Sequence, residues 1–340
     1  LKAQAGEDKV TNFREKMKLE PSELTDTELR LAQAYDNYIK LFPHTSETPL
    51  FLANAGALFY RHHQYRNALR YFNTLLKHFP GSEEVNQARF AIMESYFGKG
   101  DFKSSEIVAR RIVYGEGSTE IKSPARRRLA ESIFLSAEIM ADAEKHLAAG
   151  DEYRRAVKEA PRSEFADLAL FNAALEYDKA NEFPRAIETY NYLLATHPNS
   201  VYVLDAQNNL AFDYVELSDF SNAARTYEQL ATIHPDEEGA RDALYNSSLY
   251  FAKAEDWESA IKINTLFLQR FPADDAADDL SFEIAGFYRQ LNDMDTANRR
   301  YNDFVLQYPD SPRTVEALFY RGDYFKEEDK SKEAVIEYQR

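Results

Sequence analysis

Residues 166–198, ADLALFNAALEYDKANEFPRAIETYNYLLATHP, contain the pattern that decides the fold. Ala186 and Tyr190 are four residues apart, which places both side chains on one face of a helix. Tyr177 lies nine residues before Ala186 and belongs to a preceding helix. The stretch therefore predicts two consecutive helices, which we call an A helix and a B helix.

The ends of these helices are marked in the same stretch. The polar turn at 181–183 predicts a tight connection between the A helix and the B helix. Pro184 suits the first position of the B helix, where its missing N–H costs nothing. Pro198 ends the B helix, and Ser200 is expected to cap the next A helix.

The pattern recurs along the chain with a period of 37 residues. Prolines stand at that spacing at Pro161, Pro198, Pro235, Pro272 and Pro309. The small residue of the B helix recurs at Ala68, Ser105, Ala149, Ala186, Ala223, Ala260, Ala297 and Ala334. The aromatic residue of the A helix recurs at Phe59, Tyr96, Tyr177, Tyr214, Phe251, Tyr288 and Phe325. A single helix pair cannot bury both faces, so the sequence predicts an all-α fold, an α-solenoid of stacked antiparallel helix pairs.

Two segments depart from the period. Residues 1–24 fit no column, so the repeats are expected to cover 25–340, as one half repeat, seven full pairs and one truncated pair. Pro80 and Pro161 are 81 residues apart, seven more than two periods. Because Gly-rich and Ser/Thr-rich segments tolerate insertion, we expect a longer connection around 115–123. The chain starts without Met and stops in mid-pattern, so it is expected to be a piece of a longer protein.

Composition and charge exclude several classes of protein. Hydrophobic residues make up 44% of the chain, too much for a disordered protein. A formal net charge of -16 repels phosphate, so neither nucleic acid nor an anionic lipid surface is an expected partner. No apolar run approaches the roughly 18 residues of a membrane helix. The chain has no cysteine, which excludes disulfides and thiolate metal sites.

The charges are unevenly distributed. Residues 61–128 contain 13 Lys/Arg and 7 Asp/Glu, whereas residues 199–310 contain 8 and 21. This asymmetry either orients a partner or keeps the outer faces of a long solenoid in solution.

The columns resemble the tetratricopeptide repeat family. In one period the family's signature spacing is matched by Leu170, Ala173, Ala174, Tyr177, Ala186, Tyr190, Leu193 and Pro198. The resemblance implies a right-handed superhelix whose concave face is lined mainly by A helices. It also implies a scaffold that binds other proteins or peptide segments, with no catalytic activity and no cofactor.

The long period and the Phe-Pro-x-Ser punctuation are most similar to bacterial envelope repeat proteins. Examples are the BamD-type outer-membrane assembly lipoproteins and the TolA-binding periplasmic proteins. This resemblance implies a scaffold that organises partner proteins in the periplasm. Two alternatives stay open, namely the recognition arm of a larger enzyme or secretion machine, and a cytoplasmic peptide-binding adaptor.

A second aromatic column marks the candidate binding residues of the A helices. It consists of Phe90, Phe134, Phe171, Tyr245, Phe282 and Phe319, with Asn208 in the one gap. By resemblance to the family these residues face the groove and accept a helix or an extended segment of a partner. The alternative is that the rings pack against the neighbouring A helix as core.

Polar residues accompany this column. The next residue is asparagine at Asn54, Asn172, Asn209 and Asn246, and a ladder of amides can pair with the backbone of an extended peptide. The other interpretation is an exposed polar residue on each helix. Nearby acidic positions, at Asp205, Asp242, Asp279 and Glu316, favour a basic partner segment if they face inward.

The sequence predicts neither a catalytic nor a metal site. The nearest approach to a phosphate-binding loop is Gly98-Lys99-Gly100, which is a turn between helices. His62 and His63 are adjacent, so they point to different faces of a helix, and no His-Glu-x-x-His pattern follows them, so we expect no metal site there.

Overall fold

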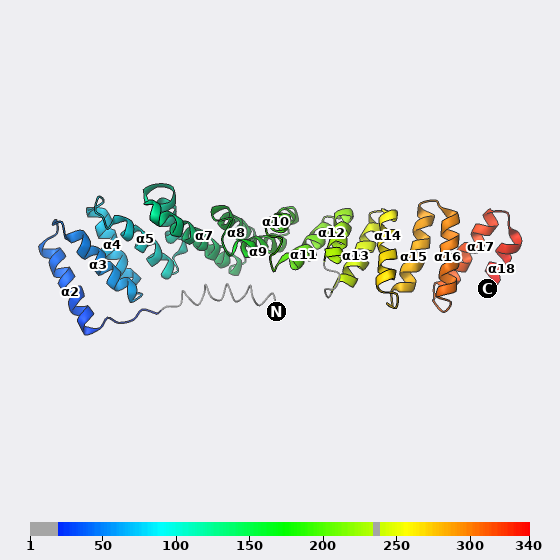
Figure 1. Ribbon diagram of the computed structural model, residues 1–340, viewed down its shortest axis with the longest axis horizontal. Coiled ribbons are helices and arrows are strands. Elements are labelled where there is room, and N and C mark those ends of the chain that lie inside the picture. Colours follow the sequence, from blue (N-terminus) through cyan, green and yellow to red (C-terminus); the bar gives the residue numbers. More distant parts are fainter. Residues whose placement is uncertain (1–19, 234–238) are drawn as a thin grey trace. The chain divides into compact units, whose positions relative to one another are not determined.

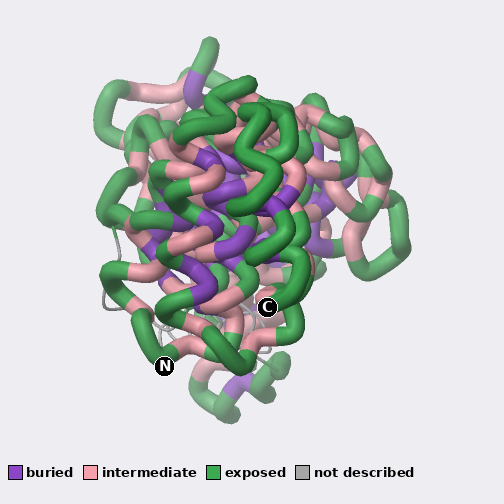
Figure 2. The backbone as a smooth tube through the Cα atoms, turned by 90° about the vertical axis from the view of Figure 1, so that its right-hand side faces the viewer, coloured by how far each residue is buried: buried purple, intermediate pink, exposed green. Residues whose placement is uncertain are grey.

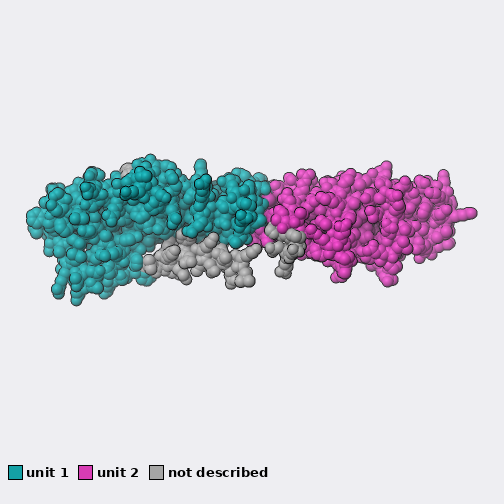
Figure 3. Space-filling view, in the orientation of Figure 1, with its two compact units in different colours: residues 1–203 teal, residues 204–340 magenta. Residues whose placement is uncertain are grey.

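The computed structural model describes residues 20–233 and 239–340. Within these ranges the chain is all-α, with seventeen α-helices, one π-helix and no strand. It divides into two compact units, up to Val203 and from Leu204 onward (Figure 3). In each unit the main contacts join helices that follow one another in sequence, and A helices alternate with B helices (Figure 1). The fold is therefore an α-solenoid built from helix pairs.

In the first unit, α2 (Asp26–Leu41) precedes four helix pairs. The pairs are α3 (Thr48–Arg61) with α4 (Tyr65–His78), α5 (Val85–Gly98) with α6 (Phe102–Arg111), α7 (Thr119–Asp142) with α8 (His146–Glu159), and α9 (Ala166–Lys179) with α10 (Phe183–Thr196). A short π-helix, η1 (Ile112–Glu116), continues α6.

Four further pairs follow, and the boundary between the units falls at the start of the first of them. They are α11 (Val203–Glu216) with α12 (Phe220–Ile233), α13 (Ala240–Lys253) with α14 (Trp257–Arg270), α15 (Ala277–Gln290) with α16 (Met294–Gln307), and α17 (Thr314–Glu327) with α18 (Ser331–Gln339).

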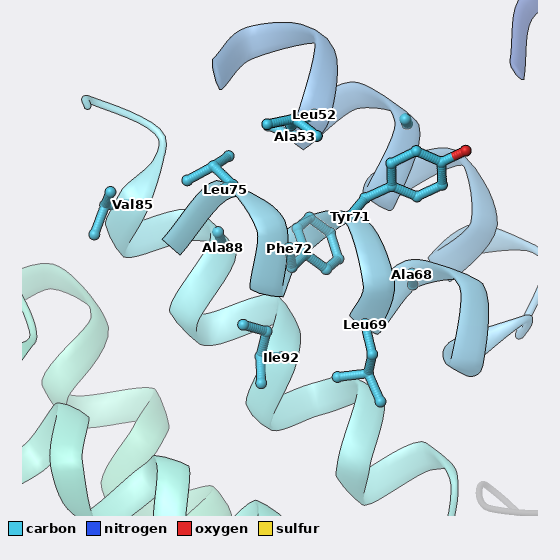
Figure 4. Close-up of a cluster of buried hydrophobic side chains, with 11 residues drawn as sticks. Leu52, Ala53, Ala68, Leu69, Tyr71, Phe72, Leu75, Val85, Ala88 and Ile92 are labelled. Carbon is cyan, nitrogen blue, oxygen red and sulfur yellow. The ribbon is translucent and has the colours of Figure 1, made fainter. Parts of the chain in front are cut away.

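The small column of the B helices is buried, which confirms its predicted role in packing. Ala186, Ala223 and Ala260 have no exposed surface. Tyr177 and Tyr190 are fully buried as well, and rings of this size fit only where the facing residue is small. Figure 4 shows the equivalent packing in the first unit, where the buried side chains of α3, α4 and α5 meet. In Figure 2 the buried positions lie on the inner sides of the helices, and the connecting turns are exposed.

The turns from A helix to B helix share one backbone conformation. The second residue before each B helix has a positive φ, between 55° and 61° at His63, Glu144, Asn181, Ser218, Glu255, Asn292 and Asp329, and 78° at Gly100. A left-handed residue at this point ends the A helix and reverses the chain. In several copies the next residue is an aspartate that caps the B helix. Asp101, Asp256 and Asp293 accept backbone N–H bonds of 3.1, 3.2 and 3.0 Å.

The prediction that serines cap the A helices was wrong. α5, α9 and α17 begin three residues after Ser82, Ser163 and Ser311 and have no side-chain cap, because an extra turn separates each serine from its helix. Ser200 and Ser311 instead donate hydrogen bonds to the A helix one repeat earlier. Their partners are Asp167, at 2.8 Å, and Asp278, at 2.6 Å.

The prediction of a longer connection around 115–123 was also wrong. The π-helix takes up 112–116, α7 begins at Thr119, and only Gly117 and Ser118 connect the two. α7 therefore has 24 residues where α9 has 14, and Pro124 lies inside it. The inserted residues are mostly good helix formers such as Ala, Lys and Arg. They therefore lengthen α7 and leave the connection before it short.

Part of the predicted N-terminal segment packs on the first pair. Residues 1–19 of that segment, and Pro235 of the proline column, lie outside the described residues. Leu24 is 9% exposed and clusters with Ala32 and Leu58. The Gln64 side chain donates a hydrogen bond of 2.9 Å to the backbone oxygen of Ser22. Residues just before α2 are therefore held against the first helix pair.

Candidate functional site

One side of α13 is exposed at helical spacing. Asp242, Tyr245 and Leu249 are separated by three and then four residues, so their side chains share one face. Tyr245 is 39% exposed and Leu249 is 40% exposed. Apolar side chains exposed on one face of a helix leave that face available to another molecule.

The same positions are exposed on α11, the preceding A helix. They hold Asp205, Asn208 and Phe212, and Phe212 is 53% exposed. We call these six residues of α11 and α13 the A-helix stripe. Each helix thus presents an acidic residue at its start, a polar or aromatic residue next, and a large apolar residue one turn further on.

The column continues differently on α15. Phe282 is 8% exposed, with its ring centroid 5.3 Å from that of Tyr301 and 5.5 Å from that of Phe304. The Arg313 guanidinium lies 5.2 Å from the ring centroid. Phe282 is therefore a core residue, whereas Phe319, at the same position of α17, is 54% exposed.

In the first unit the column is largely core. Phe134 is 2% exposed, and its ring lies 5.1 Å from that of Tyr153 and 5.3 Å from that of Phe165. Phe171 stacks on Tyr202 with ring centroids 4.9 Å apart. Of the two interpretations of this column, packing describes Phe134, Phe171 and Phe282, and surface exposure describes Tyr245 and Phe319.

Phe90 lines an open pocket between α5 and α7. The pocket has a volume of about 370 Å³, and Arg127 and Arg128 lie on its α7 side. Arg128 donates two hydrogen bonds to Glu94, of 2.7 and 2.8 Å, and one of 2.5 Å to Glu131. Burial raises the pKa of Glu131, and Arg128 acts against that rise. Arg128 of this pocket is thus already paired with both of the glutamates that line it.

The asparagines do not form one uniform exposed ladder. Of the four predicted ladder residues, Asn54 is exposed, and Asn208, from the aromatic column, is exposed in the A-helix stripe. Asn172, Asn209 and Asn246 are half-buried beside the aromatic column. A half-buried amide contacts the protein on one side and solvent on the other. A peptide backbone could therefore form hydrogen bonds only with its exposed side.

Several acidic residues near the column are paired within the protein. Arg241 bonds Asp274 at 2.9 and 2.7 Å and Asp242 at 2.8 Å. The hydrogen bonds from Arg241 hold the pKa of Asp274 at about 2. Arg313 likewise bonds Asp279 at 3.0 Å and Glu316 at 3.4 Å. Three of the four predicted acidic positions, Asp242, Asp279 and Glu316, are thus paired with an arginine. A basic partner would have to compete with that arginine at each of them.

Phe212 and Leu249 are site residues that the columns missed. Both lie four residues after the aromatic column, at Asn208 and Tyr245 respectively. An apolar residue at i+4 of a candidate groove position was the available signal, because the two side chains are neighbours on a helix.

The described residues offer little for metal binding or membrane insertion. No three His, Asp or Glu side chains among them converge in a way that could hold a metal ion. None of the described helices has the length and apolar character needed to cross a membrane.

Two segments of the chain match the sequence model of a known repeat family. The sequence model of the tetratricopeptide repeat family matches residues 168–200 and 279–311. No curated protein sequence matches the chain. A crystal structure of MamA is 15% identical, with a TM-score of 0.33, over 49% of this chain and 90% of that chain. The structure of YrrB, described as a tetratricopeptide repeat protein with an unusual peptide-binding site, is 16% identical, with a TM-score of 0.34, over 54% and 88%. The chain is therefore similar to the tetratricopeptide repeat family over two segments, one in each of its two units.

Proposed function

We propose that this chain is a protein-binding scaffold that takes up an apolar segment of a partner protein on the A-helix stripe. The observation that carries the proposal is the exposure of Phe212, Tyr245 and Leu249 in one register on α11 and α13. Exposed apolar side chains at helical spacing are typical of surfaces that receive a helix or an extended segment.

The chemistry of the stripe favours a particular partner segment. Covering each large apolar side chain contributes roughly 1.5–3 kcal/mol, part of which offsets the entropy lost on association. Asp205 and Asp242 stand at the starts of the two helices and are both exposed. A segment with apolar side chains flanked by Lys or Arg therefore complements this surface, provided that it displaces Arg241 from Asp242. Binding such a segment requires no catalytic group in this chain. We therefore propose that the chain is not an enzyme.

For the cellular location we propose the bacterial envelope, with the periplasm as the compartment. The support is the 37-residue period and the Phe-Pro-x-Ser punctuation, as at residues 79–82. Fractionation of the tagged full-length protein in its native cells tests this directly. Recovery in the cytoplasmic fraction would favour a cytoplasmic adaptor instead.

A pull-down with a matched variant tests the proposed binding role. The test variant carries Phe212→Ala, Tyr245→Ala and Leu249→Ala. The control carries Tyr192→Ala and Leu306→Ala, which remove side chains 46% and 68% exposed on the B helices α10 and α16. We expect the test variant to lose specific partners while its circular dichroism spectrum is unchanged, and the control to retain them. Retention of every partner by both variants would rule out the stripe as the binding surface.

A further inference from the structure

The B helices form a second surface, and the residues at equivalent positions of its junctions vary from copy to copy. At two junctions, the ninth residue of one B helix forms an ion pair with the sixth residue of the next. The pairs are Arg154 with Glu188, at 2.7 Å between α8 and α10, and Glu228 with Lys262, at 2.8 Å between α12 and α14. At the junction of α4 and α6 the same positions hold Asn73 and Ile107. An amide and an alkyl group cannot form an ion pair, so this junction lacks the link.

A pocket of about 260 Å³ lies at this junction, between α4, α5 and α6. Asn73 and Ile107 are among its lining residues, together with Ile92 and Ile112. Ile92 and Ile112 are 3% and 1% exposed, so the pocket reaches down to the core of the first unit. Ile107 is 49% exposed and lies at its rim. The pocket thus has an apolar floor and an opening to solvent.

Two arginines line this pocket, and Arg89 also interacts with another residue of the chain. Arg89 and Arg111 both line it, and the described lining residues include no Asp or Glu. Arg111 lies in the last turn of α6 and is exposed. Arg111 is therefore the group of this pocket that is best placed to meet an anion. A guanidinium group offers a fork of N–H donors that fits a carboxylate, sulfonate or phosphate.

We propose that this cavity, the α4–α6 pocket, binds a small anionic amphiphile with an apolar body and one anionic head group. The apolar body lies against Ile92 and Ile112, and the head group binds Arg111. Pockets for drug-sized ligands begin at about 300 Å³, so the ligand is small, about the size of a medium-chain carboxylate. The α4–α6 pocket is formed by other helices than the A-helix stripe and lies in the other unit, so the two proposals stand or fall separately.

Titration with decanoate, followed by methyl NMR of the isoleucines, tests the proposal. We expect saturable shifts of the Ile92 and Ile112 methyl resonances with decanoate. Decylamine has the same chain and the opposite charge, and we expect it to cause no such shifts. Arg111→Glu should weaken decanoate binding at least about tenfold, because it removes a charge-assisted hydrogen bond. Arg126→Glu makes the same charge change on α7, outside the pocket lining, and should leave the affinity within about twofold.

A second variant closes the pocket with a pair that the chain itself uses. Asn73→Glu combined with Ile107→Lys reproduces the residues of the Glu228–Lys262 pair at the α4–α6 junction. We expect this variant to lose decanoate binding while its melting temperature stays equal or rises. The proposal is overturned if wild-type protein shows no saturable shifts, if decylamine binds equally well, or if neither Arg111→Glu nor the double variant changes the affinity.

Discussion

The rings of Phe171 and Tyr202 stack with centroids 4.9 Å apart and planes 15° apart. Phe171 also lies 6.2 Å from the ring of Tyr190 in α10, and Tyr202 is 8% exposed. The ring of Phe171 therefore joins its own helix pair to the connection that follows it. Tyr245 occupies the same position of α13 and is 39% exposed, so one column of the sequence contains two kinds of residue.

Alanine substitution should separate these two kinds of residue. Phe171→Ala is expected to lower the free energy of unfolding by about 2–4 kcal/mol, because it removes a ring that packs on two others. Tyr245→Ala should lower it by less than about 1 kcal/mol, because much of that ring already contacts water. Urea denaturation followed by circular dichroism measures both, and equal losses would contradict the assignment of Phe171 to the core.

The left-handed residues in the A-to-B turns predict that two substitutions change the free energy of unfolding in opposite directions. Glu255 has a φ of 59°, which strains a side chain with a Cβ atom, so Glu255→Gly should raise the free energy of unfolding by about 0.5–1 kcal/mol. Gly100 has a φ of 78°, so Gly100→Ala should lower it by about 1–2 kcal/mol. Thermal denaturation of the two variants checks the signs. Two shifts in the same direction would show that backbone strain does not govern these turns.

The small column of the B helices gives a test of the packing register. Ala260 has no exposed surface, so Ala260→Arg must either bury a charge or separate α14 from its neighbours. We expect a loss of more than about 3 kcal/mol and a lower helix content. Gln269→Arg on the exposed side of the same helix is the control and should be nearly neutral. Unchanged melting of Ala260→Arg would disprove the register.

The Arg241–Asp274 pair predicts a pH dependence. Its hydrogen bonds hold the pKa of Asp274 at about 2 in the folded protein, below the roughly 3.9 of an unfolded chain. A depressed carboxyl pKa stabilises the fold above the unfolded pKa, and this contribution is lost as the pH falls from about 4 to about 2. The side chains of Arg241 and Asp274 are 39% and 19% exposed, so solvent screens the pair and its contribution to stability is small. NMR titration should give a pKa of about 2 for Asp274, rising toward about 3.9 in Arg241→Gln. An unchanged pKa in that variant would exclude Arg241 as the cause.

Much of the fold follows from the sequence, because periodicity specifies which residues share a face. Ala186, Tyr177 and Tyr190 were placed in the core from spacing alone, and all three are fully buried. Spacing does not say what covers a face. Phe282 and Phe319 stand one period apart in the sequence. Arg313 and aromatic neighbours cover Phe282, whereas Phe319 is 54% exposed.

Local features that depend on neighbouring repeats were harder to predict. Ser311 has a good N-cap residue type, but its hydroxyl bonds Asp278 in the previous repeat. The α4–α6 pocket could not be predicted from the sequence, because its lining residues come from three α-helices and η1, whose packing is seen only in the structure.

Site-specific photocrosslinking tests the central claim, partner binding on the A-helix stripe, most directly. A photoreactive phenylalanine analogue is placed at Phe212 or Tyr245, and at Leu306 on α16 as a control that is more accessible than either. Full-length protein carrying each substitution is irradiated in its native cells. The scaffold account predicts the same crosslinked partner at Phe212 and Tyr245, and none at Leu306. Crosslinks of equal yield at all three positions, or at Leu306 alone, would contradict it.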